Sequence, residues 1–428
     1  MELWLESVHS DGTAAFVSNP TPAMFEDVSI RLRLYEDAPV SHVVLRSMPN
    51  GMERLDDMHI VKRENGFVYY EATLNMNEKR IQYHFYLVCD HAVYFYTQKE
   101  ITTYLPDHTY DFVLLADYIQ PEWVREAVFY QIFPERFCNG NPTNDVRDGE
   151  YTQNGHPTIQ MKSWNLPALH YEDAYCLDFF GGDLQGGVWD APMNYFGCGR
   201  VIRQFLGEPD LFMQKHPALR NISYKMTAQD VKHRIMEHLA KLLYVIWENQ
   251  FNLFDSHDTS RLHNNPKVNP EEYRGAIMFQ FMLPGAASIY YGDEAGIDGY
   301  IDSMEGCRYP MPWNKEFTSC EQYQLIHTMA KLKANHPALS KGSMKILCAQ
   351  GNVFAIARFW EQEAFVCVIS TDDEDTAVRI PLGAVGAQRP SGNTDIFGKE
   401  LSMELHDSHS VTMQVKAHQS YLFICNVL

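Results

Sequence analysis

The chain has 428 residues and a formal net charge of −20, so it is long enough for two to four compact domains. The acidic balance argues against nucleic acid as a partner, because phosphate binding requires clustered Lys and Arg side chains. No stretch approaches the ~18 uninterrupted apolar residues of a spanning helix, so no membrane partner is expected. Nine scattered Cys residues without a C-x-x-C motif, and no leader-like start, predict reduced thiols and a cytoplasmic protein.

Residues 1–120 contain short stretches in which apolar and polar residues alternate, as in VSIRLRLYE at 28–36. Further stretches of this kind are HVVLRS, GFVYYEATL, IQYHFYLVC, AVYFYT and YDFVLL. Alternation with a period of two is typical of strands that bury one face. Many such strands separated by turn residues predict a β-sandwich.

Residues 121–338 differ, because strand-like and helix-like stretches alternate there. EAVFYQIFPERF at 126–137 predicts a strand buried on both faces, and a long loop rich in Asn, Gly and Asp follows at 137–182. TAQDVKHRIMEHLAKLLYVIWEN predicts one helix that begins with a capping box of Thr227 and Asp230. Strand, helix, strand and helix then follow in QFNLFDSHD, EEYRGAIMFQFML, GAASIYYGDEAG and EQYQLIHTMAKLKANH. This alternation predicts parallel α/β structure.

Residues 339–428 return to short strand-like stretches. They are SMKILCA, VFAIARFW, AFVCVIST, TAVRIPL, SVTMQV and SYLFICNVL. These stretches predict a second β domain at the end of the chain.

Polar residues follow three of the expected parallel strands. Tyr130, Gln131 and Glu135 follow the first, residues 256–258 (Ser-His-Asp) follow the second, and residues 291–294 (Tyr-Gly-Asp-Glu) follow the third. The carboxyl ends of parallel barrel strands meet on one face, where barrel enzymes keep their sites. We therefore expect the functional residues of this region at these strand ends.

Six stretches occur in an order that resembles successive landmarks of the α-amylase family of glycoside hydrolases, above all its neopullulanase, cyclomaltodextrinase and maltogenic amylase branch. They are VFYQIFPERFCNGNPTND, FFGGDLQG, DAPMNYFG, NLFDSHDTSRL, LPGAASIYYGDEAG and CRYPMPWN. The resemblance implies a multidomain α/β plus β fold. We expect an immunoglobulin-like β-sandwich of the glucan-binding or dimerisation type at 1–120, an abbreviated (β/α)8 TIM-type barrel at 121–338, and a C-terminal β-sandwich at 339–428.

The resemblance also implies an activity, the retaining cleavage of α-1,4 or α-1,6 bonds in α-glucan oligosaccharides or cyclodextrins. Asp258 matches the family carboxylate that stabilises the transition state, and His257 would donate a hydrogen bond to the same sugar. The other matching substrate-binding residues are Tyr130, Arg308, Tyr309 and Trp313. A polar strand end and ordinary loop packing are the alternative interpretations of these residues.

The stretch FFGGDLQGGVWDAPMNYFG at 179–197 joins two landmarks that the family keeps far apart. The segments that carry the nucleophile Asp and the general acid Glu should lie between them and are absent, and Gly187 stands where the acid is expected. Retaining cleavage needs two carboxyl groups ~5 Å apart. The nearby carboxylates of Asp190, Glu208 and Asp210 have no spacing that would replace that pair. We therefore expect the chain to be inactive as given.

A calcium site is a further expectation, because hard oxygen ligands are closely spaced in NGNPTND and GGD. The candidate ligands are Asn139, Asn141, Asn144, Asp145, Gly181 and Asp183. Related enzymes bind calcium with residues that match these. The alternative is a turn in which Asn side chains cap their own backbone.

Two functional hypotheses follow. The first is a hydrolase by descent whose catalytic middle is absent, through a natural deletion or an incomplete gene. The second is a non-catalytic α-glucan-binding or subunit-interaction protein. In both cases an interrupted barrel exposes strand edges and apolar faces, so we expect a homo-oligomer.

Overall fold

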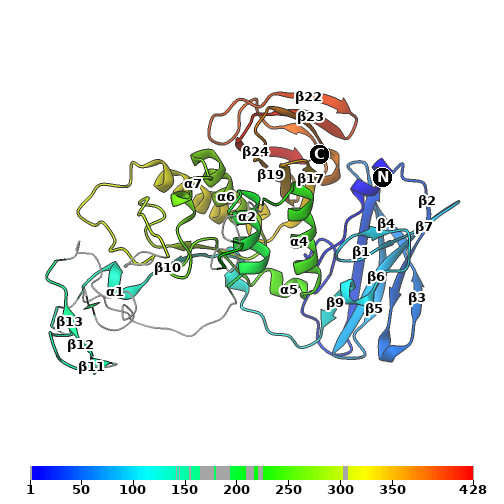
Figure 1. Cartoon of the computed structure of the whole chain (residues 1–428). Coiled ribbons are helices and arrows are strands. Elements are labelled where there is room, and N and C mark those ends of the chain that lie inside the picture. Colours follow the sequence, from blue (N-terminus) through cyan, green and yellow to red (C-terminus); the bar gives the residue numbers. More distant parts are fainter. Residues whose placement is uncertain are drawn as a thin grey trace.

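The computed structural model describes residues 2–140, 142–143, 145–153, 156–163, 178–179, 193–208, 216–219, 225–301 and 307–427. Figure 1 shows the strands of the N-terminal part in blue, the central helices mostly in green and yellow, and the C-terminal sheets in orange and red. Among the described residues, no helix has the length and apolar character needed to cross a membrane. The eight cysteines in these ranges are free thiols.

The N-terminal part consists of two antiparallel sheets. One has the order β1-β5-β4, and the other has the order β3-β2-β6-β7-β8, with β9 also paired to β6. The strands are β1 (Asp27–Tyr35), β2 (Val40–Ser47), β3 (Arg54–Asp57), β4 (His59–Glu64), β5 (Phe67–Asn75), β6 (Arg80–Cys89), β7 (Val93–Tyr96), β8 (Ile101–Thr102) and β9 (Phe112–Leu115). Six of them coincide with the alternating stretches of the sequence. The stretches that form β3 and β4 were not predicted as strands, and both are almost entirely exposed.

The core of this part is built from alternate residues of the paired strands. Val28, Ile30, Leu32 and Leu34 of β1 are at most 1% exposed, as their spacing predicts. They belong to one apolar cluster with Phe85 of β6, which lies in the other sheet. Burial of one face of each sheet therefore stabilises this part of the chain.

The central part contains a parallel sheet with the order β10-β16-β15. Its strands are β10 (Val128–Gln131), β15 (Phe251–Asn252) and β16 (Ala286–Tyr290). A parallel bridge between Met193 and Phe251 adds a fourth position beyond β15. The three strand ends selected from the sequence thus share one sheet, and the MNY landmark joins them.

Strand β10 differs from its prediction. Val128 and Tyr130 are 36% and 43% exposed, although we expected burial on both faces. Within the described residues β10 pairs only with β16, so one of its edges has no strand neighbour. The predicted strand also stops at Gln131, and the short helix α1 (Pro134–Phe137) follows.

The helix predicted over 227–249 is divided in two. Helix α4 (Ala228–Ala240) begins with the expected capping box of Thr227 and Asp230, and α5 (Tyr244–Trp247) follows a short break. At the break, Leu243 adopts an extended conformation with ψ of 146°. The periodic apolar pattern continues across this break and therefore did not reveal it.

A contact from the N-terminal part supports the break. The Nε2 amide of Gln98 donates hydrogen bonds to the carbonyl oxygens of Leu239 (3.1 Å) and Leu242 (2.7 Å). These carbonyls lie where the helix ends. The Leu239 carbonyl also accepts from the Leu242 N–H at 2.9 Å and from the Trp247 indole N–H at 2.6 Å. A side chain distant in sequence thus adds hydrogen bonds to the groups at the end of α4.

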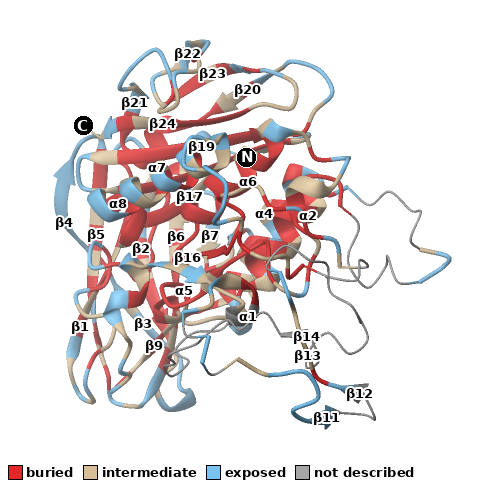
Figure 2. Ribbon diagram, turned by 90° about the vertical axis from the view of Figure 1, so that its left-hand side faces the viewer, coloured by how far each residue is buried: buried red, intermediate tan, exposed pale blue. Residues whose placement is uncertain are grey.

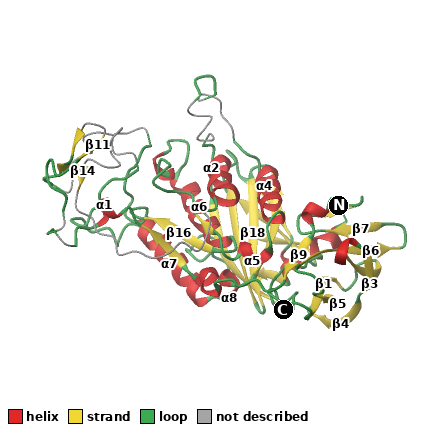
Figure 3. Cartoon of the chain, turned by 90° about the horizontal axis from the view of Figure 1, so that it is seen from below, coloured by secondary structure: helices red, strands yellow, loops and turns green. Residues whose placement is uncertain are grey.

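The remaining helices are α2 (Arg200–Phe205), α6 (Pro270–Met282), α7 (Glu321–Asn335) and α8 (Pro337–Ser340). Of these, α6 contacts both the parallel strand β16 and the C-terminal strands β19 and β24, and α8 contacts β18 and β19. The C-terminal part has a five-stranded antiparallel sheet, β17-β18-β19-β24-β21, and a three-stranded one, β20-β23-β22. Helices α4 and α6 lie beside β18, as Figure 3 shows, and share an apolar cluster with the five-stranded sheet.

The C-terminal strands are β17 (Ser343–Gln350), β18 (Val353–Trp360), β19 (Glu363–Ser370), β20 (Thr376–Ile380), β21 (Ala387–Pro390), β22 (Met403–Asp407), β23 (Ser410–Val415) and β24 (Ser420–Val427). Short pairs β11 (Thr152–Gln153) with β12 (His156–Pro157) and β13 (Ile159–Gln160) with β14 (Asp178–Phe179) lie in the long central loop. Figure 2 shows the β11–β12 hairpin outside the buried body of the molecule.

Candidate functional site

The loop after β15 presents two polar side chains and buries the residues around them. The side chains of His257 and Asp258 are 35% and 58% exposed, and His257 Nε2 lies 3.5 Å from Asp258 Oδ1. Asp255, Ser256 and Thr259 are at most 2% exposed. The two residues expected to bind a sugar therefore form one polar surface at the carboxyl end of the parallel sheet.

Hydrogen bonds within this loop hold its backbone. The Ser256 N–H donates to Thr259 Oγ1, and the Asp258 N–H donates to Ser256 Oγ, both at 3.1 Å. The Leu262 N–H donates to Asp255 Oδ1 at 3.0 Å. The polar side chains that flank Asp258 are thus occupied by the backbone of their own loop.

Arg203 of α2 reaches the start of the loop. Its Nη1 donates to the Phe254 carbonyl at 2.9 Å and to Asp255 Oδ1 at 2.6 Å. Burial lowers the pKa of Arg203, but the carboxylates of Glu208 and Asp255 outweigh burial and raise it. The guanidinium is therefore charged, and it fixes the position of the loop against α2.

Arg261 fastens the end of the loop to the end of β16. This side chain is fully buried, donates to Asp293 Oδ1, and donates to the Tyr291 carbonyl at 2.7 Å. Burial and the nearby Asp255 raise the pKa of the Asp293 carboxyl, and Arg261 opposes that rise. The ends of two parallel strands are thus joined by one buried ion pair.

The MNY landmark lies next to this loop. The Tyr195 hydroxyl is 3.1 Å from Ser256 Oγ, and Asn194 Nδ2 donates to Asn252 Oδ1 at 2.9 Å. The unusual join in the sequence therefore leads directly to the candidate sugar-binding loop. Sequence reasoning named this landmark but not Tyr195, because its partner Ser256 lies 61 residues further along the chain.

Tyr130 and Glu294 connect the ends of β10 and β16. The Tyr130 hydroxyl donates to one carboxylate oxygen of Glu294, and the Gly292 N–H donates to the other at 2.9 Å. Burial raises the pKa of Glu294, and the hydrogen bond from Tyr130 opposes that rise. Tyr130 is 43% exposed, so its ring remains accessible beside the strand ends.

The loop with the other expected substrate-binding residues is attached to α1 and β16. Trp313 is 51% exposed, and its indole N–H donates to the Phe137 carbonyl. The Tyr309 carbonyl accepts from the Tyr291 hydroxyl at 2.8 Å. Arg308 is only 4% exposed, and its guanidinium lies 5.4 Å from the centre of the Phe133 ring. Trp313 therefore offers an open aromatic face, whereas Arg308 is buried.

One of the carboxylates considered as a catalytic substitute is occupied. Glu208 is 5% exposed and its Oε2 lies 2.7 Å from Arg203 Nε. An ion pair of this kind leaves no free carboxylate for proton transfer. Asp190, Asp210 and Gly187 lie outside the described residues.

Two of the expected calcium ligands can be placed. Asn139 Nδ2 lies 3.1 and 3.0 Å from the two carboxylate oxygens of Asp145. The amide N–H of Asn139 therefore donates to the carboxylate, as in the alternative interpretation of a hydrogen-bonded turn, and this contact alone does not form a set of oxygen donors for calcium. The other expected ligands, Asn141, Asn144, Gly181 and Asp183, lie outside the described residues.

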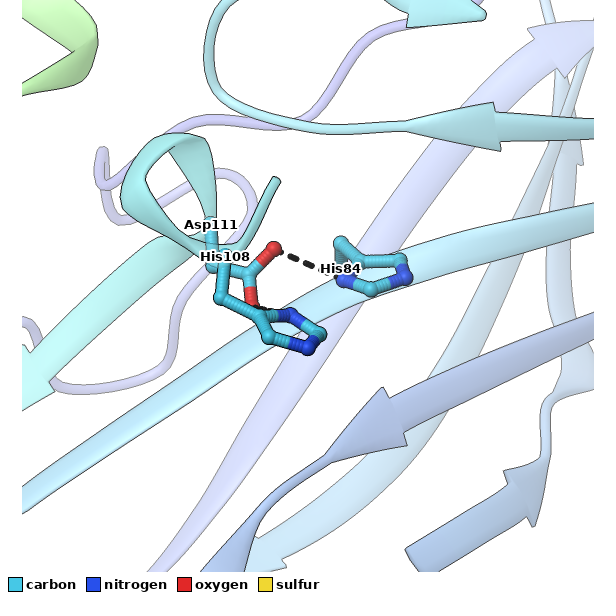
Figure 4. A group of neighbouring side chains, drawn as sticks. All are labelled: His84, His108 and Asp111. Carbon is cyan, nitrogen blue, oxygen red and sulfur yellow. Dashed lines mark hydrogen bonds and ion pairs between the residues drawn. The ribbon is translucent and has the colours of Figure 1, made fainter. Parts of the chain in front are cut away.

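A second group of ligand-type residues lies in the N-terminal part (Figure 4). Asp111 accepts from His84 Nδ1 at 2.7 Å through one oxygen and lies 3.3 Å from His108 Nδ1 through the other. Arg46 Nη1 lies 3.6 Å from Asp111 Oδ2 and 3.2 Å from His108 Nδ1. This guanidinium already provides a positive charge and would repel a metal ion. The group therefore acts as a hydrogen-bonded network that connects the turn at 108–110 to β6.

Comparison with known proteins places these features in a family. Residues 22–120 match the alpha amylase N-terminal ig-like domain, and residues 210–342 match the alpha amylase catalytic domain. A cyclomaltodextrinase of Bacillus sp is 31% identical over 202 residues, which cover 47% of this chain and 33% of that protein. Neopullulanase 2 of Thermoactinomyces vulgaris is 27% identical over 209 residues, which cover 48% of this chain and 33% of that protein.

The chain thus matches about a third of the length of these curated relatives. A solved structure, the type III pullulan hydrolase from Thermococcus kodakarensis, has a TM-score of 0.54 at 15% identity and covers 98% of this chain and 100% of its own. That likeness concerns the fold alone. The sequence matches confirm the resemblance: the chain carries regions that match the N-terminal and catalytic domains of the alpha amylase family, and the relatives that it matches include a cyclomaltodextrinase and a neopullulanase.

Proposed function

We propose that the chain binds α-glucan oligosaccharides at the surface formed by His257 and Asp258 and does not hydrolyse them. The observation that carries this proposal is the exposed Asp258 carboxylate on a loop in which Asp255, Ser256 and Thr259 are buried. The kinship with a cyclomaltodextrinase supports a glucan as the ligand. Such a site recognises sugar hydroxyls and needs no cofactor to do so.

The chemistry of the accessible groups suits a sugar. A carboxylate such as Asp258 accepts hydrogen bonds from hydroxyl groups, and these charge-assisted bonds are stronger than neutral ones. His257 lies beside it and offers a ring N–H, while the exposed face of Trp313 suits an apolar sugar face. Small-molecule sites combine aromatic and polar groups of this kind.

Hydrolysis needs more than these groups. A retaining mechanism requires a nucleophile and a proton donor across one bond, ~5 Å apart. The described carboxylates at the strand ends are engaged, Asp255 by Arg203, Asp293 by Arg261 and Glu294 by Tyr130. Groups that stabilise a transition state cannot replace the residues that create it.

The experiment combines binding with turnover. Calorimetry with maltotriose, pullulan and a cyclodextrin measures affinity, and prolonged incubation with each measures hydrolysis. Replacing Asp258→Ala should weaken binding about 10- to 100-fold, because a hydrogen bond to a charged group contributes about 1.5–3 kcal/mol. Turnover by the natural chain that disappears in Asp258→Ala would refute the proposal, as would binding that Asp258→Ala leaves intact.

A bound calcium ion is part of the same proposal. The closely spaced oxygen donors of NGNPTND and GGD support it, and the ion would tie the long loop at 137–182 to the rim of the sheet. We expect chelation to lower the melting temperature by a few degrees through loss of binding free energy. An unchanged melting temperature in chelator, together with nil metal content, would argue against the ion.

Self-association is also proposed. It is supported by the unpaired edge of β10 among the described residues and by apolar side chains exposed there, including Val128 and Trp123. Unpaired edges and exposed apolar groups favour pairing with another chain.

A further inference from the structure

We propose that Arg203 is a positioning residue that holds the loop bearing His257 and Asp258 in the conformation that binds a glucan. This inference rests on the proposed function of that loop. Arg203 comes from α2, which follows the unusual join in the sequence. The segment after the join would thus serve the site without contacting the sugar.

The guanidinium of Arg203 spans the loop from one end to the other. Nη1 bonds to the carbonyl of Phe254 and the carboxylate of Asp255, before the exposed residues. Nη2 donates to the Ser260 carbonyl at 2.6 Å, after them. His257 and Asp258 therefore lie between two fixed points that share one buried cation.

The opposite side of the same guanidinium is held by another residue. Glu208 Oε1 accepts from Nη2 at 2.8 Å, and its Oε2 lies 2.7 Å from Nε. Both oxygens of Glu208 thus face Arg203, and Glu208 is as buried as Arg203, each being 5% exposed. Arg203 therefore makes two sets of contacts. Its bonds to Phe254, Asp255 and Ser260 form the loop-holding face, and its contacts with Glu208 form the anchoring face.

Hydrogen bonds to residues outside the loop hold other parts of its backbone and side chains. The Ser260 hydroxyl accepts from the Ile301 N–H at 2.9 Å, and the Arg261 N–H donates to the Gly299 carbonyl at 2.8 Å. The Ser256 hydroxyl contacts Tyr195 at 3.1 Å. These neighbours thus fix the loop, while the side chains of His257 and Asp258 remain 35% and 58% exposed.

This arrangement lowers the entropic cost of binding. Ordering a mobile side chain or loop on association consumes free energy, and a site that is already ordered avoids that loss. Ligand-facing groups held by a supporting shell bind more tightly than the same groups on a loose loop. Loosening the Arg203 contacts should therefore weaken binding even though Asp258 itself remains.

Two variants separate this role from general stability. Arg203→Lys keeps one positive charge but cannot bond to Phe254, Asp255 and Ser260 together. Glu208→Gln weakens the anchoring face and leaves the loop-holding face in place. We expect Arg203→Lys to raise the Kd for maltotriose about tenfold, and Glu208→Gln to change it less than about twofold.

Hydrogen exchange of the amides at 256–262 gives a readout that does not depend on the ligand. Exchange in this segment should accelerate in Arg203→Lys and stay as in the natural chain in Glu208→Gln. Equal affinities and equal exchange in the two variants would overturn the proposal. If Arg203→Lys does not fold, Asp255→Asn is the substitute variant, because Asn has the shape of Asp but lacks the charge that pairs with Arg203. We expect the same rise in Kd and the same faster exchange for it.

The outcomes distinguish this inference from the function on which it rests. If the natural chain binds no maltotriose, the proposed function fails and exchange alone decides whether Arg203 positions the loop. If the natural chain binds and Asp258→Ala does not, but Arg203→Lys binds normally, the function stands and the positioning role fails.

Discussion

Two regions of the central parallel sheet differ in how completely their groups are paired. We call the carboxyl end of the sheet its closed end, and we call the edge of β10 that lacks a strand partner among the described residues its open side. At the carboxyl end, the loop after β15 is held by Arg203, Arg261 and its own backbone. At the side, β10 pairs with β16 alone among the described residues and exposes Val128. A sugar-facing loop needs only its immediate neighbours for order, whereas a buried barrel strand needs partners on both edges.

The first test concerns the closed end and has the largest expected effect. Arg261→Met should lower the free energy of unfolding by about 3–5 kcal/mol, because Asp293 would remain buried without its cation. Urea unfolding measures the change. Arg389→Met removes an exposed arginine and serves as the control. A similar small loss in both variants would mean that the ion pair does not hold the strand ends together.

The second test concerns the contact that joins the open side to the closed end. Tyr130→Phe removes the hydroxyl that donates to Glu294 and should cost about 1–3 kcal/mol of unfolding free energy, because a buried carboxylate loses its donor. Urea titrations at several pH values measure it.

The pH dependence of this loss has a definite sign. Burial raises the pKa of Glu294 in the folded protein, so the associated stability is present at low pH and is lost as the pH rises through that pKa. Removing the Tyr130 donor raises this pKa further. The variant should therefore lose more stability at pH 8 than at pH 5, and the reverse order would contradict the assigned hydrogen bond.

The third test concerns the open side and has the smallest expected effect. Val128→Lys should shift the chain toward monomer, with about a tenfold weaker self-association, because a charge on an edge strand opposes pairing. Light scattering after size exclusion measures the mass. Ile119→Lys alters an exposed apolar residue outside the sheet and is the matched control. A natural chain that is already a monodisperse monomer would end the self-association proposal.

Much of the fold could be predicted because apolar spacing is a local property. The burial of Val28 and Ile30 and the capping box at Thr227 follow from residues close in sequence. The exposure of Val128 could not be predicted in this way, because it depends on which distant strands pair with β10. Among the described residues its strand partner is β16 alone. The break before Leu243 was missed for a similar reason, since Gln98 from another part of the chain donates hydrogen bonds to carbonyl oxygens there.

For the candidate site, the sequence alone predicted the chemistry, namely a sugar-binding role for His257 and Asp258 at a strand end without a matching nucleophile and acid. Residue type and order along the chain are sufficient for such a prediction. Only the tertiary structure decided which side chains remain available, leaving Asp258 exposed and burying Arg308 and Glu208. The physical reason is that ion pairs such as Arg203 with Asp255 form between residues far apart in sequence, and no local pattern encodes them.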